Sequence, residues 1–347
     1  MDSRNQYRHL FLSVALGILA LPLGTAGAST LVVANKAEAT VSLIDLDSAT
    51  VVATLPAGVG PHEVGISPDG RFAMVTNYGN RESSGNSLTM IDIGAAAVVK
   101  TIDLGEYLSP HGVEWVDSGT IAVTAEDNKA LLVIDVATEE VISAIDTDQD
   151  VSHMVSLGED GKRAYVTNIG SGSLTVIDLE SGERIANIPT GEGAEGIAVS
   201  GKQIWVTNRG DDTISILGTE SLEVAAELSS KGFPIRATAT PLGQILVTRA
   251  NAGDMVVYDT KNFQEVLTVT FDLKSMDVED RLFGDRFGDS SVPIGVVVDE
   301  TGQRAFVAHA NADVITEIDL QSGTIVRPLT AGKEPDGMGW SPVVAGR

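Results

Sequence analysis

Three histidines stand at the same point of a repeated sequence pattern, and this spacing could bring them together around a metal ion. Each of the three follows a proline or serine and precedes a short hydrophobic run. A glutamate and an aspartate occupy the corresponding point in two other copies of the pattern. Imidazole and carboxylate groups that converge in space suit Zn²⁺, Cu²⁺ or another borderline divalent ion. The sequence therefore predicts a divalent metal site, for Zn or Cu, with five candidate ligands: His62, His111, His153, Glu195 and Asp336.

Two other interpretations of the three histidines stay open. Without a metal, any of them could act as a general base beside a carboxylate such as Glu63. Each could also only hydrogen-bond the backbone at the crowded start of a strand. In the remaining two copies the same position holds Ile235 and Ile294, so we expect an apolar wall on that side of the site.

Three arginines and one more histidine are candidates for ligand binding near the same edge. Arg209, Arg236 and Arg249 belong to adjacent copies, and His309 ends a hydrophobic run in the next one. Guanidinium groups that converge could clamp a carboxylate or phosphate of a small ligand. The alternative is that these arginines pair with the many acidic side chains of the chain.

The elements that must position these residues are β-strands in a sevenfold repeat. Similar runs recur about every forty-two residues and end in Val-Thr-Asn or a degenerate version of it. Alternating hydrophobic residues, β-branched enrichment and turn clusters predict four strands in each copy. We therefore predict an all-β fold, a seven-bladed β-propeller with four antiparallel strands per blade. The seven signature runs are Thr30–Asn35, Arg71–Asn77, Thr120–Ala125, Arg163–Asn168, Gln203–Asn208, Gln244–Arg249 and Arg304–His309.

The two ends of the repeat predict how the ring closes. The sequence enters the pattern at Thr30 with the second of the four strands of a copy. The last segment, Asp336–Trp340, corresponds to the first of the four strands. The C-terminal strand should therefore join the three strands of residues 30–56 and leave no free edge. This assignment makes residues 29–347 a single domain.

Two insertions are expected on the face that carries the histidines. One is a loop at Gly79–Ser87, and the other is the connection of residues 273–292, which carries Phe283 and Phe287 among many charged residues. A long excursion in an economical repeat is often functional. The second insertion is predicted to cover the channel mouth, and a solvated decoration is the alternative.

The N-terminus resembles a secretory signal. Arg4 and Arg8 precede an apolar run, Leu10–Leu23, which leads into small residues before Ser29. We expect residues 1–28 to be removed, no stable membrane span to remain after cleavage, and the protein to be periplasmic or secreted.

Composition narrows the classes of partner. The chain of 347 residues has a formal net charge of −25 and no cysteine. Disulfides and thiolate sites are excluded, and nucleic acid should be repelled. An unknown protein partner or a small anionic ligand at a local basic site remains possible.

The run Tyr165-Val166-Thr167-Asn168 resembles the signature of the YVTN family of β-propeller repeats. The resemblance covers residues 30–342 and implies the propeller fold. The segment Val292–Gly295 with Ala305–Ala308 is also loosely similar to exported propellers associated with quinoprotein dehydrogenase systems. Neither resemblance implies an activity.

Three functions are therefore compatible with the sequence. The first is an exported binding or scaffold protein that holds a ligand, divalent metal or partner protein on its histidine-bearing face. The alternative is a metal-assisted lyase or hydrolase acting on a small anionic substrate. A structural repeat protein is the third.

Overall fold

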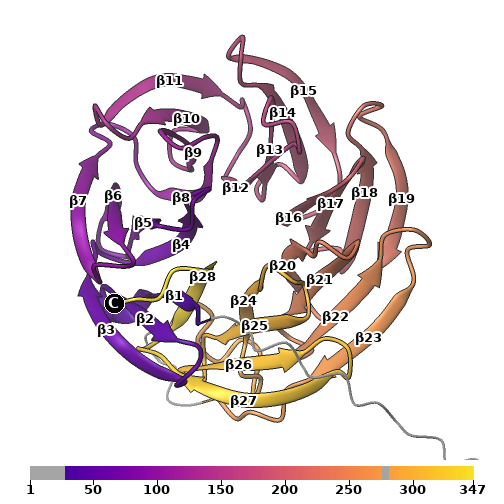
Figure 1. Cartoon of the computed structure of the whole chain (residues 1–347). Helices are drawn as coiled ribbons and strands as arrows, with labels where there is room; N and C mark the ends of the chain where they lie inside the picture. The colour runs from indigo at the N-terminus through magenta and orange to yellow at the C-terminus, as the bar shows by residue number, and fades with distance from the viewer. Residues whose placement is uncertain (1–27, 276–280) are drawn as a thin grey trace, which may run out of the picture.

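A ring of seven four-stranded antiparallel sheets surrounds a central channel (Figure 1). The computed structural model describes residues 28–275 and 281–347. Within those ranges the only helical element is one 3₁₀ turn, η1 (Lys36–Glu38). The predicted seven-bladed propeller is confirmed. The described residues contain no apolar helix of membrane-spanning length, and the predicted signal peptide, apart from Ala28, lies outside them.

Each blade runs from an inner strand at the channel to an outer edge strand (Figure 1). The inner strands are β4 (Pro61–Ile66), β8 (Pro110–Trp115), β12 (Ser152–Leu157), β16 (Ala194–Ser200), β20 (Pro234–Ala239), β24 (Pro293–Val298) and β28 (Pro335–Ser341). The second strands carry the signature runs and are β1 (Thr30–Asn35), β5 (Phe72–Gly79), β9 (Thr120–Ala125), β13 (Arg163–Asn168), β17 (Gln203–Asn208), β21 (Gln244–Arg249) and β25 (Arg304–His309).

The third and fourth strands complete the blades. The third strands are β2 (Thr40–Asp45), β6 (Ser84–Asp92), β10 (Ala130–Asp135), β14 (Ser173–Asp178), β18 (Thr213–Gly218), β22 (Asp254–Asp259) and β26 (Val314–Asp319). The outer strands are β3 (Thr50–Pro56), β7 (Ala97–Asp103), β11 (Glu140–Asp146), β15 (Glu183–Pro189), β19 (Val224–Ser229), β23 (Glu265–Thr270) and β27 (Thr324–Thr330).

The ring closes by pairing the last strand with the first signature strand. β28 is antiparallel to β1, with Leu31 opposite Trp340 and Val33 opposite Met338. The Thr30 hydroxyl also donates a 2.7 Å hydrogen bond to the carbonyl of Val343. The predicted closure is therefore confirmed, and β1 is paired along both of its edges.

Hydrophobic side chains between neighbouring blades form the core. The second and third strands are buried almost throughout, because each lies between two sheets. Tyr165 and Trp205 are among the largest fully buried side chains. The outer strands instead alternate between exposed and half-buried residues, as expected for edge strands with one packed face.

The threonine of the Val-Thr-Asn signature joins several blades to the next one. Thr124, Thr167 and Thr248 donate hydrogen bonds of 2.5 to 2.7 Å to inner-strand carbonyls of the following blade. Two of the accepting carbonyls belong to His153 and Glu195. The repeat signature therefore fixes the backbone of candidate site residues directly.

One predicted loop is wrong in its extent. Residues 79–87 extend a hairpin, because Gly79 of β5 pairs with Ser84 of β6 and leaves only residues 80–83 as the turn. Gly79 has a φ of 99°, which a residue with a Cβ rarely adopts.

An aspartate caps the turn after the third strand in several blades. Asp45 Oδ1 accepts hydrogen bonds from the backbone N–H groups of Asp47 and Ser48, at 3.0 and 2.8 Å. The backbone hydrogen bond from Ser48 is the main cause that holds the pKa of Asp45 below its ordinary value. The equivalent carboxyls with a lowered pKa are Asp92, Asp135, Asp178 and Asp319.

These carboxyls predict acid-dependent stability. A carboxyl whose pKa is lower in the folded than in the unfolded state stabilises the fold at pH values above its unfolded pKa of about 3.9. This contribution is lost as the pH falls through the pKa of the folded state. We expect Asp45→Ala to lower the thermal midpoint at pH 7 by about 2–4 °C and to lessen its decline towards pH 3, measured by circular dichroism. Asp47→Ala, at an exposed neighbour, is the control. Identical pH profiles of Asp45→Ala and the unmodified protein would contradict this role.

Candidate functional site

The second residue of every inner strand lines one cavity at the channel mouth. The cavity has a volume of about 290 Å³. We call it the histidine cavity, and the seven residues, in order around the ring, are Asp336, His62, His111, His153, Glu195, Ile235 and Ile294. The structure thus brings together all five proposed metal ligands, with the two isoleucines as the expected apolar wall.

The backbone before each of these residues is set by two repeated features. The residue preceding every inner strand has a positive φ, including Val151 at 57°, Phe233 at 66° and Val292 at 54°. A positive φ is costly for residues with a bulky side chain. A β-bulge follows at the start of all seven inner strands. Bulges re-aim side chains, so the same local distortion presents one residue per blade to the cavity.

The three histidines lie against one another. The ring centroids of His62 and His111 are 4.1 Å apart, and those of His111 and His153 are 3.5 Å apart. His111 is fully buried, and neither of its ring nitrogens has a hydrogen-bond partner. Burial, together with the neighbouring His153 and His62, lowers the pKa of His111 well below its ordinary value. His111 is therefore a neutral imidazole with an unused lone pair.

The two outer histidines are held by carboxylates. His62 Nδ1 lies 2.7 Å from Asp336 Oδ2. Burial still lowers the pKa of His62, because the Asp336 carboxylate offsets only part of the desolvation. His153 Nδ1 is hydrogen-bonded to Glu126, and its Nε2 lies 3.3 Å from Glu195 Oε1. Burial lowers the pKa of His153, but these two carboxylates outweigh it and raise the value overall.

A second group of side chains comes from the position immediately after the signature run of a blade. In the blades that carry Asp336, His62 and His111 this position holds Lys36, Tyr78 and Glu126, and all three line the histidine cavity. The Tyr78 hydroxyl donates a 2.6 Å hydrogen bond to Glu126. Lys36 Nζ lies 3.2 Å from His62 Nε2. Sequence reasoning missed these residues, although the same repeat alignment, read one position beyond the signature run, would have identified them.

The predicted arginine clamp is not formed by free arginines. Arg209 and Arg236 line the histidine cavity, but both pair with Glu195, and Arg236 also contacts Glu63 at 2.7 Å. Burial raises the pKa of Glu195, and the His153 hydrogen bond and Arg209 outweigh it and lower the value to about 2. Arg249 forms a bidentate pair with Asp254, at 2.7 and 2.6 Å, outside the cavity lining. Pairing with acidic side chains, the alternative stated above, is what the structure shows.

His309 is also outside the cavity lining. Its Nδ1 lies 2.9 Å from Ser291 Oγ, and its Nε2 lies 3.0 Å from Thr316 Oγ1. His309 is the last residue of its signature run. At the equivalent position of the first blade, Asn35 donates hydrogen bonds to hydroxyl groups of the third strand. Both ring nitrogens of His309 therefore have hydrogen-bond partners within the blade, and its role is structural. The residue type and position in the sequence did not predict these partners.

The insertion before β24 lies over the cavity. Leu282 and Phe283 line the histidine cavity, and Phe283 packs edge-to-face on Phe233 with centroids 5.9 Å apart. Arg281 anchors this segment through a bidentate pair with Asp313. Within the insertion, Leu282 and Phe283 thus lie at the cavity, the cover stays a prediction, and Asp277, Glu279 and Asp280 lie outside the described residues.

The donor atoms of two groups are close enough for one ion. In His111, Glu126 and His153, and again in His62, Glu63 and His111, the ligand atoms lie within 4.8 Å of one another. His111 belongs to both groups. An imidazole and carboxylate set of this kind suits a divalent transition metal.

Comparisons with known proteins agree with the fold. Residues 117–336 match the family model described as cytochrome D1 heme domain, and residues 17–120 match that of a YNCE-like beta-propeller. A search of curated proteins found no match.

Several solved structures share the architecture. A chain of Kuenenia stuttgartiensis hydrazine synthase is 21% identical, with a TM-score of 0.66 over 87% of this chain and 99% of that one. A functionally unknown protein from Desulfotomaculum acetoxidans is 14% identical, with a TM-score of 0.75 over 90% and 99%. Dihydro-heme d1 dehydrogenase NirN, in complex with DHE, is 15% identical, with a TM-score of 0.64 over 89% and 74%.

A haem, which the name of one family model implies, does not fit the histidine cavity. Its volume of about 290 Å³ is at the lower end of the ~300–1,000 Å³ found for small-molecule pockets. The imidazoles touch, with centroids 3.5 and 4.1 Å apart, so no planar slot separates them. The donor set suits a single ion instead.

Proposed function

Because this chain belongs to the cytochrome D1 heme domain family, we propose that it is an exported binding propeller that holds one divalent transition-metal ion, and not a haem, at its channel mouth. The ligands are His111, His153 and Glu126, with His62 within reach on the other side of His111. Asp336 orients His62, as a carboxylate generally orients an imidazole that ligates a metal.

One observation carries this proposal. The His111 ring is fully buried, and both of its nitrogens are without a partner. Buried polar groups are almost always hydrogen-bonded, because leaving one unpaired costs about 1–3 kcal/mol. A metal ion on His111 would give a partner to the one ring nitrogen that carries a lone pair.

Metal analysis of protein purified without a histidine tag tests the proposal. We expect close to one equivalent of Zn or Cu per chain, an increase in thermal midpoint when metal is added back to stripped protein, and no Soret absorbance after incubation with hemin. Binding to the folded state alone raises stability. Metal-free protein whose midpoint does not respond to Zn²⁺ or Cu²⁺ would overturn the proposal, and so would a stoichiometric haem complex.

A second candidate, a metal-assisted lyase or hydrolase for a small anionic substrate, is favoured by a larger pocket that adjoins the cavity. Lys36, Tyr78 and Leu282 line both spaces. A bound ion would supply Lewis-acid polarisation of a substrate carbonyl. Screening metal-loaded protein against lactones and small esters decides between a carrier and an enzyme.

A further inference from the structure

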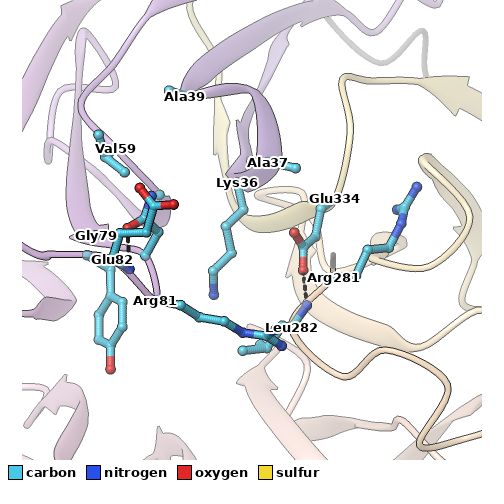
Figure 2. A pocket seen from close by; sticks show the side chains of 13 residues that line it. Lys36, Ala37, Ala39, Val59, Gly79, Arg81, Glu82, Arg281, Leu282 and Glu334 are labelled. Carbon is cyan, nitrogen blue, oxygen red and sulfur yellow. Dashed lines mark hydrogen bonds between the residues drawn. The ribbon is translucent and has the colours of Figure 1, made fainter. Parts of the chain in front are cut away.

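A pocket of about 540 Å³ lies outside the histidine cavity, and we call it the outer pocket (Figure 2). Its walls come from five separate parts of the chain: η1 with Ala39, Val59 and Gly60 before β4, residues 78–82 at the β5–β6 hairpin, Arg281 and Leu282 of the insertion, and Glu334 before β28. Each wall belongs to a different blade or connection, so the pocket exists only in the closed ring.

The charges of the outer pocket differ from those of the whole protein. Three cationic side chains and two carboxylates line it, whereas the chain as a whole carries a net charge of −25. Arg281 is engaged with Asp313, and Glu334 accepts a 2.6 Å hydrogen bond from the backbone N–H of Leu282. Lys36 Nζ in turn lies 3.5 Å from Asp336 Oδ2, which leaves Arg81 as the pocket cation without a carboxylate partner among the described residues.

Arg81 is the cation available to a ligand. Its guanidinium makes no hydrogen bond or ion pair with the described residues, although the chain has 48 acidic residues. Figure 2 shows Arg81 extending across the pocket below Lys36, towards Leu282. Lys36 Nζ reaches the floor of the pocket, where it contacts His62 and lies 3.5 Å from Asp336 Oδ2.

The other walls are apolar. Val59 and Leu282 line the pocket, and each is 47% exposed. Ala37, Ala39 and the Tyr78 ring complete this surface. A simple inorganic anion would leave it unused, whereas an organic anion would cover it and gain hydrophobic free energy.

We propose that the outer pocket binds a small organic carboxylate. The carboxylate accepts hydrogen bonds from the Arg81 guanidinium, whose geometry favours bidentate contact, with Lys36 as the second positive charge. The apolar body of the ligand lies against Val59 and Leu282. This site does not include the arginines proposed from the sequence, and it does not require a metal ion in the histidine cavity.

Calorimetric titration with benzoate tests this site. We expect saturable binding to the full chain, both metal-loaded and metal-stripped, and much weaker binding of benzyl alcohol, which has the ring without the charge. Arg81→Gln should weaken benzoate binding about tenfold, as expected when a charge-assisted hydrogen bond is lost. Arg71→Gln, at an arginine paired with Asp92 outside the pocket, is the matched control and should change affinity less than twofold.

The outcomes separate this site from the metal proposal. Equal binding of benzoate and benzyl alcohol, or an Arg81→Gln variant with unchanged affinity, overturns the carboxylate site whatever the metal content. Stronger binding of inorganic phosphate than of benzoate also overturns it, because the apolar walls would then contribute nothing. Benzoate binding to protein that fails to bind metal would support this site while refuting the metal centre.

Discussion

We expect His111→Ala to abolish the proposed stoichiometric metal binding and to lower the affinity for Zn²⁺ or Cu²⁺ at least about 100-fold, because even an outer-shell partner of a metal ligand contributes 10- to 100-fold. His111 is the residue shared by both donor groups, so neither group retains its full set without it. Competition with a chromophoric chelator measures the change. The stripped variant should be no less stable than the stripped parent, since the substitution removes an unpaired buried imidazole.

His309→Ala is the matched control for this experiment. Both histidines are 0% exposed, but His309 bonds Ser291 and Thr316 and is remote from the donor groups. Its removal should lower the thermal midpoint and leave metal affinity within about twofold. Equal losses of metal affinity in the two variants would show that His111 acts only through the fold.

Arg236→Met destabilises the protein by about 3–5 kcal/mol, the usual cost of removing one partner of a buried ion pair. Arg236 is 5% exposed and lies between Glu195 and Glu63, at 2.8 and 2.7 Å. Its carboxylate partners raise the pKa of Arg236 above its ordinary value despite burial. The substitution keeps the volume of the side chain but leaves two carboxylates without their shared cation.

Urea unfolding followed by tryptophan fluorescence measures this effect. Arg71→Met removes an arginine that is 60% exposed in its pair with Asp92, and surface pairs of this kind contribute about 0–1 kcal/mol. We therefore expect a much larger loss from the buried substitution than from the exposed one. Similar losses would mean that the network around Glu195 is solvated and carries little of the stability.

The fold could be predicted from the sequence because the same strand and turn signals recur in seven copies. Alternation, turn residues and the Val-Thr-Asn signature identify the second strands, and the position of Asp336–Trp340 predicts the closure. The same register also predicts which residues meet. A position that recurs in each blade must form a ring around the channel, so the convergence of the histidines, Glu195 and Asp336 follows from the repeat alone.

The pairing of those residues could not be predicted in the same way. A register places residues on a ring, but it does not say that Glu126 turns to His153 or that Arg249 turns outward to Asp254. Such contacts depend on side-chain reach between blades and on competition among many carboxylates. His309 shows the limit clearly, because it has the right residue type on the right face and yet bonds within its own sheet.

Closure by β28 also has a consequence for the order of folding. The first three strands of the first blade are synthesised at the start, but their inner partner spans Pro335–Ser341 near the end of the chain. Six blades can form as they emerge, while the first remains an open edge until synthesis is nearly complete. Because residues 335–341 also supply Asp336, the lining of the histidine cavity cannot be completed before β28 has been synthesised. The histidine cavity is therefore complete only after the ring has closed.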